Sequence, residues 1–237
     1  MRSATRTRSF YYLAAVFTAF IIFLYGPMAI IVLLSFQGPE GGLTFPMNGI
    51  SVFWFERLWE GVGVIDIWRA FRRSVGLGLV VMLSTVVFSL AAGLAFRQRF
   101  FGASFVFFVV VSSLIVPSIV VSLGIGLQFQ LLDNVVMWLG ERYDIAYLND
   151  EFQTTMGLFT SALGAHLTWT LPFGLLIMFA VFNRFNKSHE EAARDLGATP
   201  WQTIRYIVIP IIVPSLIGVA LFGFTLSYDE LARTQQA

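Results

Sequence analysis

Residues 188–210 read SHEEAARDLGATPWQTIRYIVIP and form the longest polar-to-amphipathic passage in the second half of an apolar chain. Ser188 and Glu191 have the three-residue spacing of a capping box, in which a hydroxyl and a carboxylate cap the first turn of a helix. Acidic side chains also suit the positive end of a helix dipole. Gly197 fits the left-handed position just past a helix end. The first half of the passage therefore predicts a helix over 189–196.

The second half of the passage carries the signals of another helix start. Thr199 is followed by Pro200 and, three residues on, by Gln202, which predicts a second capping box with proline in the first turn. Pro210 and Pro214 mark the start of the next apolar run and weaken its backbone ladder, because proline has no N–H to donate. We expect three apolar side chains to seat the second helix on the membrane domain: Trp201, Ile204 and Ile207. The pattern is that of a rigid lever attached to an apolar helix.

The composition indicates an all-α integral membrane protein. Of the 237 residues, 57% are hydrophobic and 12% are charged, whereas a soluble domain carries about 25% charged residues. Several apolar runs exceed the roughly 18 residues that indicate a membrane-spanning helix. The five predicted spans are approximately residues 10–36, 74–96, 103–132, 154–182 and 207–227.

Proline and aromatic residues mark features within and between these spans. Gly26-Pro27 breaks the first apolar run, and Pro117 lies inside the third. The stretch SVFWFERLWE at 51–60 predicts a short interfacial helix, because tryptophan is common at the membrane–water boundary. We divide the chain into an N-terminal span with an external segment, residues 1–73, and a transmembrane domain, residues 74–237.

Charge placement predicts the orientation in the membrane. With the N-terminus inside, the inside segments hold nine basic residues and three acids, and the outside segments hold six basic residues and eleven acids. Cytoplasmic segments are enriched in Lys and Arg, so a cytoplasmic N-terminus is favoured, with the Arg72-Arg73 pair as the main exception. The inside basic residues are Arg2, Arg6, Arg8, Arg97, Arg99, Arg184, Lys187, Arg194 and Arg205. The passage at 188–210 is then cytoplasmic.

Several kinds of chemistry find no support in the sequence. Cysteine is absent, and His166 and His189 are not spaced for a metal site. No Gly-rich phosphate-binding loop surrounds Lys187, the only lysine. The spans hold no Asp, Glu, Lys or Arg before Asp229, which argues against an ion-coupled carrier. His166, deep in a span, is more often a packing residue than a ligand, and both interpretations stay open. No nucleophile–base pair is visible for an intramembrane enzyme.

The same passage resembles the signature of the permease subunits of bacterial ABC importers that use a soluble binding protein. That signature is Glu-Ala-Ala, three residues, Gly, nine residues and Ile-x-Leu-Pro. The matching residues here are Glu191, Ala192, Ala193, Gly197, Ile207, Ile209 and Pro210, with every interval correct. Ile209 in place of leucine is the one departure. The resemblance covers about residues 74–227, and more loosely the first span.

The resemblance implies a MetI-like helical bundle in the bacterial inner (cytoplasmic) membrane, with a helix-turn-helix coupling loop between the fourth and fifth spans. It implies two ATP-binding subunits, a second permease subunit, homologous or identical, a periplasmic substrate-binding protein and membrane lipid as partners, and no nucleic acid. The ATPase would bind ATP and Mg, so this chain is expected to be no enzyme and to hold no cofactor or metal. The coupling loop that docks in the ATPase would comprise Glu190, Glu191, Ala192, Ala193, Gly197 and Ala198, with Ile207, Pro210 and Pro214 at the start of the fifth span.

Within the family, SVFWFERLWE and FTLSYDEL are most similar to the polyamine-type permeases. This implies spermidine, putrescine or a similar small polar solute as the cargo, moved by alternating access. The acidic outside segments suit a cation, although solvated loop charges explain them as well. Candidates for a polar path are Ser112, Ser113, Ser118, Ser122 and Asp229, and helix packing explains the serines about equally.

Two alternatives remain open. The family pattern has a sixth span, whereas the ten residues after Ser227 are polar. We expect that the sequence stops before its last helix and is then not competent for transport alone; the alternative is a natural protein that lacks this helix. The alternative function is a non-transport scaffold or receptor whose cytoplasmic loop binds a partner. It predicts binding without substrate-stimulated ATP hydrolysis.

Overall fold

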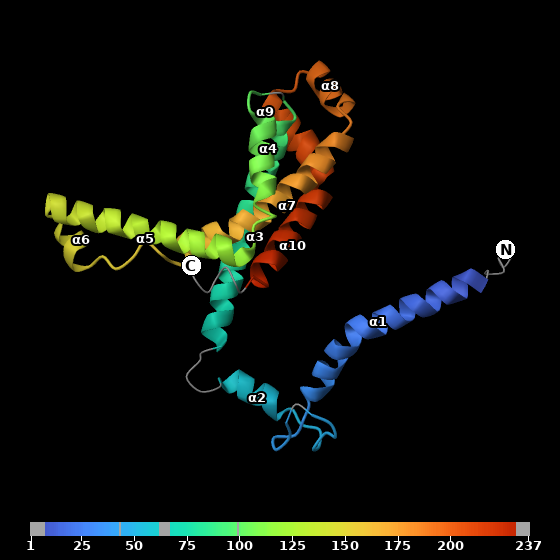
Figure 1. Cartoon of the computed structure of the whole chain (residues 1–237). Helices are drawn as coiled ribbons and strands as arrows, with labels where there is room; N and C mark the ends of the chain where they lie inside the picture. Colours follow the sequence, from blue (N-terminus) through green and yellow to red (C-terminus); the bar gives the residue numbers. More distant parts are fainter. Residues whose placement is uncertain (1–7, 43, 62–66, 99, 231–237) are drawn as a thin grey trace. The chain divides into compact units, whose positions relative to one another are not determined.

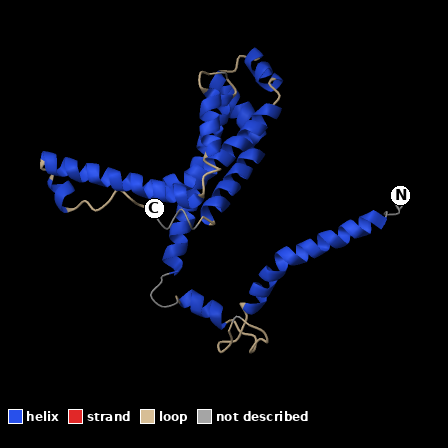
Figure 2. Ribbon diagram, in the orientation of Figure 1, coloured by secondary structure: helices blue, strands red, loops and turns tan. Residues whose placement is uncertain are grey.

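The computed structural model describes residues 8–42, 44–61, 67–98 and 100–230 (Figure 1). Over these residues the chain consists of helices and loops, with one isolated bridge between Gln37 and Ile50 (Figure 2). In the described part of the chain, five helices are long and apolar enough to cross a membrane. The chain divides into two compact units, Met1–Ala70 and Phe71–Ala237. The sequence-based expectations for Arg2, Arg6 and Arg99 lie outside the described residues.

The first unit contains one long helix and one short helix. α1, Arg8–Leu34, continues through Pro27 as one helix, in agreement with the single span predicted over 10–36. A proline inside a membrane helix is tolerated because neighbouring groups and local adjustments satisfy the freed carbonyl. α2, Phe53–Glu60, forms where a short helix was predicted. Between them Gln37 is buried, donates to the carbonyls of Gly42 and Thr44, and accepts from the Asn48 amide.

The third predicted span is two helices. α4, Ala103–Ser112, has ten residues and is too short to cross a membrane, whereas α5, Ser118–Tyr143, has 26. Pro117 is the cause, because its ring disfavours helical geometry at the preceding residue and it lacks an N–H. The Ser113 hydroxyl donates to the Val110 carbonyl at 2.7 Å and to the Thr168 carbonyl at 3.0 Å. The single helix expected over 103–132 is therefore wrong.

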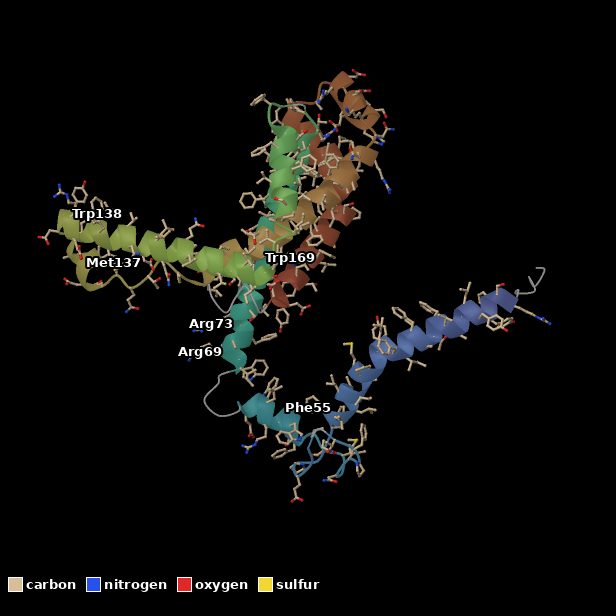
Figure 3. All side chains as sticks on the ribbon, viewed as in Figure 1. Phe55, Arg69, Arg73, Met137, Trp138 and Trp169 are labelled. Atoms are coloured by element: carbon tan, nitrogen blue, oxygen red, sulfur yellow. The ribbon has the colours of Figure 1, made fainter. Side chains whose placement is uncertain are left out.

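α5 also extends past the predicted end of the third span at 132 and includes acidic residues that the charge count placed outside. Asp133 accepts hydrogen bonds from the Thr154 hydroxyl at 2.6 Å and from the Thr155 amide at 2.6 Å. Beyond it, Met137 and Trp138 are exposed on the second half of the helix (Figure 3). The short helix α6, Ala146–Asp150, follows.

The core of the second unit is built by three long helices. These are α3, Ile67–Phe96, which begins seven residues before the predicted Ser74; α7, Leu163–Arg184; and α10, Ile209–Tyr228. A π-helical turn, η1, Leu158–Ala162, precedes α7. The largest apolar cluster joins α7 to α10 and consists of Met178, Phe182, Val208, Ile212 and Val219, with Val86, Leu90 and Leu94 of α3 against it. Figure 1 shows these helices side by side.

Small residues and hydroxyls let the three helices approach closely. A β-carbon added at Gly174 would clash with Ser89 Oγ, and one at Gly93 would lie 2.8 Å from the ring of Phe182. The buried Thr85 hydroxyl donates to the Thr170 hydroxyl at 2.8 Å. Membrane helices lack a hydrophobic driving force for pairing, so close packing and interhelical hydrogen bonds hold them together. α3 and α7 are therefore a tightly packed pair.

Candidate functional site

The first helix of the predicted cytoplasmic passage is α8, Ser188–Asp195. Lys187 occupies the N-cap position, and its carbonyl accepts from the amides of Glu190 and Glu191. The Ser188 hydroxyl donates to Asn186 Oδ1 at 2.7 Å, and the Ser188 amide donates to the same oxygen at 3.1 Å. The predicted capping box between Ser188 and Glu191 is therefore wrong, because the helix begins one residue earlier and Asn186 takes the serine hydroxyl.

The end of α8 follows the sequence prediction at Gly197. This glycine has φ +86°, in the left-handed region. The Ala198 amide donates to the Ala193 carbonyl at 3.0 Å and the Gly197 amide to the Arg194 carbonyl at 2.8 Å. These are the two hydrogen bonds of a Schellman motif, which satisfies the last carbonyls of a helix. The helix end is thus fixed by the backbone itself.

The second short helix, α9, Pro200–Thr203, has the predicted capping box. The Gln202 amide donates to Thr199 Oγ1 at 3.3 Å, and the Thr199 amide donates to Gln202 Oε1 at 2.8 Å. Trp201 is exposed, however, and does not seat the helix as predicted. Thr203, two residues on, is buried instead and donates to the Thr199 carbonyl at 3.1 Å. A helix this short turns one face inward, and Trp201 lies outside that face.

α9 runs on into α10 through a wide turn. Residues Ile204–Val208 form the π-helical turn η2, in which Val208 is buried and Ile207 is partly buried. Pro210 follows in the first turn of α10, and Pro214 lies inside that helix. A proline ring collides with the carbonyl four residues earlier in a regular α-helix, and a wider turn relieves the crowding. The predicted weakening of the ladder at the start of this span therefore has a structural counterpart.

α8 turns two different faces to its surroundings. Glu190 and Ala193 are buried, at 8% and 9% exposure. Glu191 and Ala192 are exposed, and Leu196, at the C-cap, is 90% exposed. Both alanines belong to the predicted docking loop, but Ala193 is buried and only Ala192 is exposed. The outer face of α8 therefore presents the adjacent Glu191 carboxylate and Ala192 methyl group, with the large apolar side chain of Leu196 about one turn further on.

The inner face of α8 is held by an ion pair that the sequence did not predict. Arg97, just after α3, contacts Glu190 Oε1 through Nη2. Arg194 lies 3.8 Å from the other carboxylate oxygen. A cavity of about 370 Å³ adjoins the pair and is lined by these side chains together with Lys187, Glu191 and Thr203. The available sequence signal was an arginine at the inner end of a span and an extra acid before the signature glutamate.

Two of the candidate path residues, Ser112 and Ser113, have hydroxyls that donate to backbone carbonyls. The Ser112 hydroxyl donates to the Val109 carbonyl at 2.8 Å, and Ser113 bonds to two carbonyls as described above. Ser118 begins α5, and Ser122 is fully buried in it. Asp229 caps the end of α10 and is exposed. The helix-packing interpretation of the first two serines thus accounts for their hydroxyls.

His166 is a buried, hydrogen-bonded residue of the helix core. Its Nδ1 lies 2.9 Å from the Ser227 hydroxyl of α10, which agrees with a packing role. Among the described residues no group of three or more His, Cys, Asp or Glu side chains is placed to hold a metal ion.

Comparisons with known proteins find similar sequences over most of the chain. Residues 8–232 match the family described as binding-protein-dependent transport system inner membrane component. The chain is 29% identical to the putrescine transport system permease protein PotI of Escherichia coli K12, over 88% of this chain and 68% of that protein. It is 31% identical to the spermidine/putrescine transport system permease protein PotC of Haemophilus influenzae, over 88% of this chain and 72% of that protein. A PotC homolog of Mycoplasma pneumoniae is 24% identical over 92% of this chain and 72% of its own length.

Proposed function

Since this chain belongs to the family of binding-protein-dependent transport system inner membrane components, we propose that the outer face of α8 docks an ATP-binding subunit. As a member of the family the chain is a multi-pass permease component of the inner membrane, and such subunits are not catalytic. The observation that carries the proposal is the fixed α8–α9 corner, which exposes Glu191, Ala192 and Leu196 while Glu190 and Ala193 are buried.

The corner has the properties of a docking element. Both ends of α8 are closed by hydrogen bonds, at Lys187 and at Gly197, so little conformational entropy is lost when a partner binds. Leu196 offers an apolar anchor for a groove, and Ala192 lets a groove wall approach closely. Glu191 adds a charge that selects a basic partner surface. Movement of a docked ATPase then reaches α10 through η2, because η2 joins α9 to α10 without a break.

A bulky charge on the outer face tests this docking. In the Ala192→Arg variant, co-purification of the cognate ATP-binding subunit is expected to fall at least tenfold, because the guanidinium occupies the space of the groove wall. The matched control is Asn183→Arg, the same residue placed at an exposed position at the end of α7. Equal loss in both variants, or retained binding in Ala192→Arg, would contradict the proposal. Neither ATP nor Mg is proposed to bind this chain.

The proposed cargo is a small polyamine such as spermidine or putrescine. Support comes from the printed functions of the relatives, at 29% and 31% identity, and from the eleven acids assigned to outside segments. Asp229 at the end of α10 is one of them. Uptake of labelled putrescine by cells that express the assembled transporter, competed by spermidine but not by a neutral amino acid, is the expected result. Competition by the amino acid alone would assign another cargo.

We further propose a cytoplasmic N-terminus, a second permease subunit and a periplasmic binding protein as parts of the assembly. The sequence has no cysteine, so a single introduced cysteine reports its own side of the membrane. A cysteine at Ser188 is expected to react with a membrane-impermeant maleimide only after the inner membrane is opened. A cysteine at Glu40 is expected to react while the inner membrane is still intact. The reverse pattern would invert the orientation.

A further inference from the structure

One side chain, just after the C-terminal end of α3, contacts three segments of the second unit. The Arg97 guanidinium contacts the Glu190 carboxylate of α8. The same guanidinium lies over the rings of Phe182, at 5.1 Å, and Phe185, at 5.5 Å, at the end of α7. The side chains of Arg97 and Glu190 are only 17% and 10% exposed. A charge pair this sheltered is screened little by water and salt.

This pair links α8 directly to the residue that follows α3. The main backbone contacts of α8 are with α9 and η2, its neighbours in the sequence. α3 itself is tied firmly to α7 near its inner end, where Gly93 leaves no room for a methyl group against Met178 and Phe182. A displacement of α8 therefore reaches α3 and α7 through Arg97, in addition to the route through η2.

We propose that Arg97 is a positioning residue that fixes the coupling helix α8 on the C-terminal ends of α3 and α7. Its part in driving transport rests on the proposed function, whereas its part in fixing α8 does not. The site favours arginine over lysine, because the planar guanidinium contacts a carboxylate and covers aromatic rings at the same time. Arg194 supplies a matched control: it also lies near Glu190, at 3.8 Å, but is 61% exposed.

The first experiment measures the position of α8 in the full chain, without any partner. Spin labels are attached to cysteines introduced at Ala95 of α3 and Asp195 of α8, which are both exposed, and no native cysteine interferes. Arg97→Gln is expected to broaden the distance distribution at least twofold, whereas Arg194→Gln leaves it unchanged. The double variant Arg97→Glu with Glu190→Arg is expected to restore part of the narrowing. An unchanged distribution in Arg97→Gln would overturn the inference.

A folding defect is separated from a local one by a second variant. Arg97→Lys keeps the positive charge but loses the planar guanidinium that covers the two phenylalanine rings. We therefore expect a distance distribution of intermediate width, between those of the wild type and Arg97→Gln. If Arg97→Gln is not monodisperse, the distance distribution is measured in Arg97→Lys instead. A distribution as narrow as in the wild type overturns the inference, and a broader one supports it.

The second experiment concerns coupling in the assembled transporter. Arg97→Gln is expected to retain the ATP-binding subunit but to lower solute uptake per ATP hydrolysed about tenfold. Normal coupling in this variant would overturn the role in transport. Failure of the unaltered chain to bind the ATP-binding subunit would instead contradict the proposed function, and the spin-label result would still stand on its own.

Discussion

Replacing Gly197 with alanine isolates the backbone geometry of the coupling corner. Gly197 has φ +86°, and a β-carbon added there would meet nothing within 4 Å. The whole penalty is therefore conformational, about 1–2 kcal/mol for an L-residue in the left-handed region. If the ATP-binding subunit binds only the present conformation of the α8–α9 corner, the binding free energy should weaken by up to this penalty, which is a factor of about 5–30 in Kd.

The control for this change is Gly218→Ala in α10. Its β-carbon would also meet nothing within 4 Å, and its backbone is helical, so the substitution should be neutral or stabilising by up to about 1 kcal/mol. The affinity of Gly197→Asn for the ATP-binding subunit should lie between those of the wild type and Gly197→Ala, because asparagine tolerates the left-handed region better than alanine. The assay is the affinity of each purified variant for the ATP-binding subunit. Wild-type affinity in Gly197→Ala would refute the claim that the corner is a rigid docking element.

Two further predictions concern the helix core. Gly174→Ala places a methyl group against Ser89, and the overpacking should lower stability by about 1–3 kcal/mol. Gly164→Ala in the same helix meets nothing within 4 Å and should leave the Tm in detergent unchanged or slightly raised. Thr85→Val removes a buried interhelical hydrogen bond and should lower the stability of the folded protein by about 0.6 kcal/mol. The control, Thr225→Val, removes only a hydrogen bond within its own helix. Equal shifts in Tm would show that the interhelical bond contributes nothing.

The sequence predicted features that depend on neighbouring residues alone. The left-handed Gly197 and the Thr199–Gln202 box formed as predicted, because spacing and residue type fix both. The Ser188 cap failed because Asn186, two residues upstream, competes for the same hydroxyl. A pattern that names one cap does not rank the alternatives within the same few residues.

Features set by contacts between distant segments were not predictable in this way. Pro117 was noted inside an apolar run, but whether proline bends or ends a membrane helix depends on what satisfies the freed carbonyls. Here Ser113 reaches a carbonyl of α7, and the chain forms two helices. Glu190 and Arg97 lie 93 residues apart in the sequence, so their pairing appears only after α3 and α8 meet. The buried acid was missed for that reason.

Two adjacent alanines provide the most direct test of the docking surface. Ala192 is exposed and Ala193 is buried. Since the sequence contains no cysteine, a cysteine introduced at either position is the only one that can carry a crosslinker. A photoreactive crosslinker on a cysteine at Ala192 is expected to capture the ATP-binding subunit, whereas the same crosslinker at Ala193 is expected to capture little or none. Equal capture at both positions, or capture at Ala193 alone, would contradict the assignment of the outer face of α8 as the docking surface.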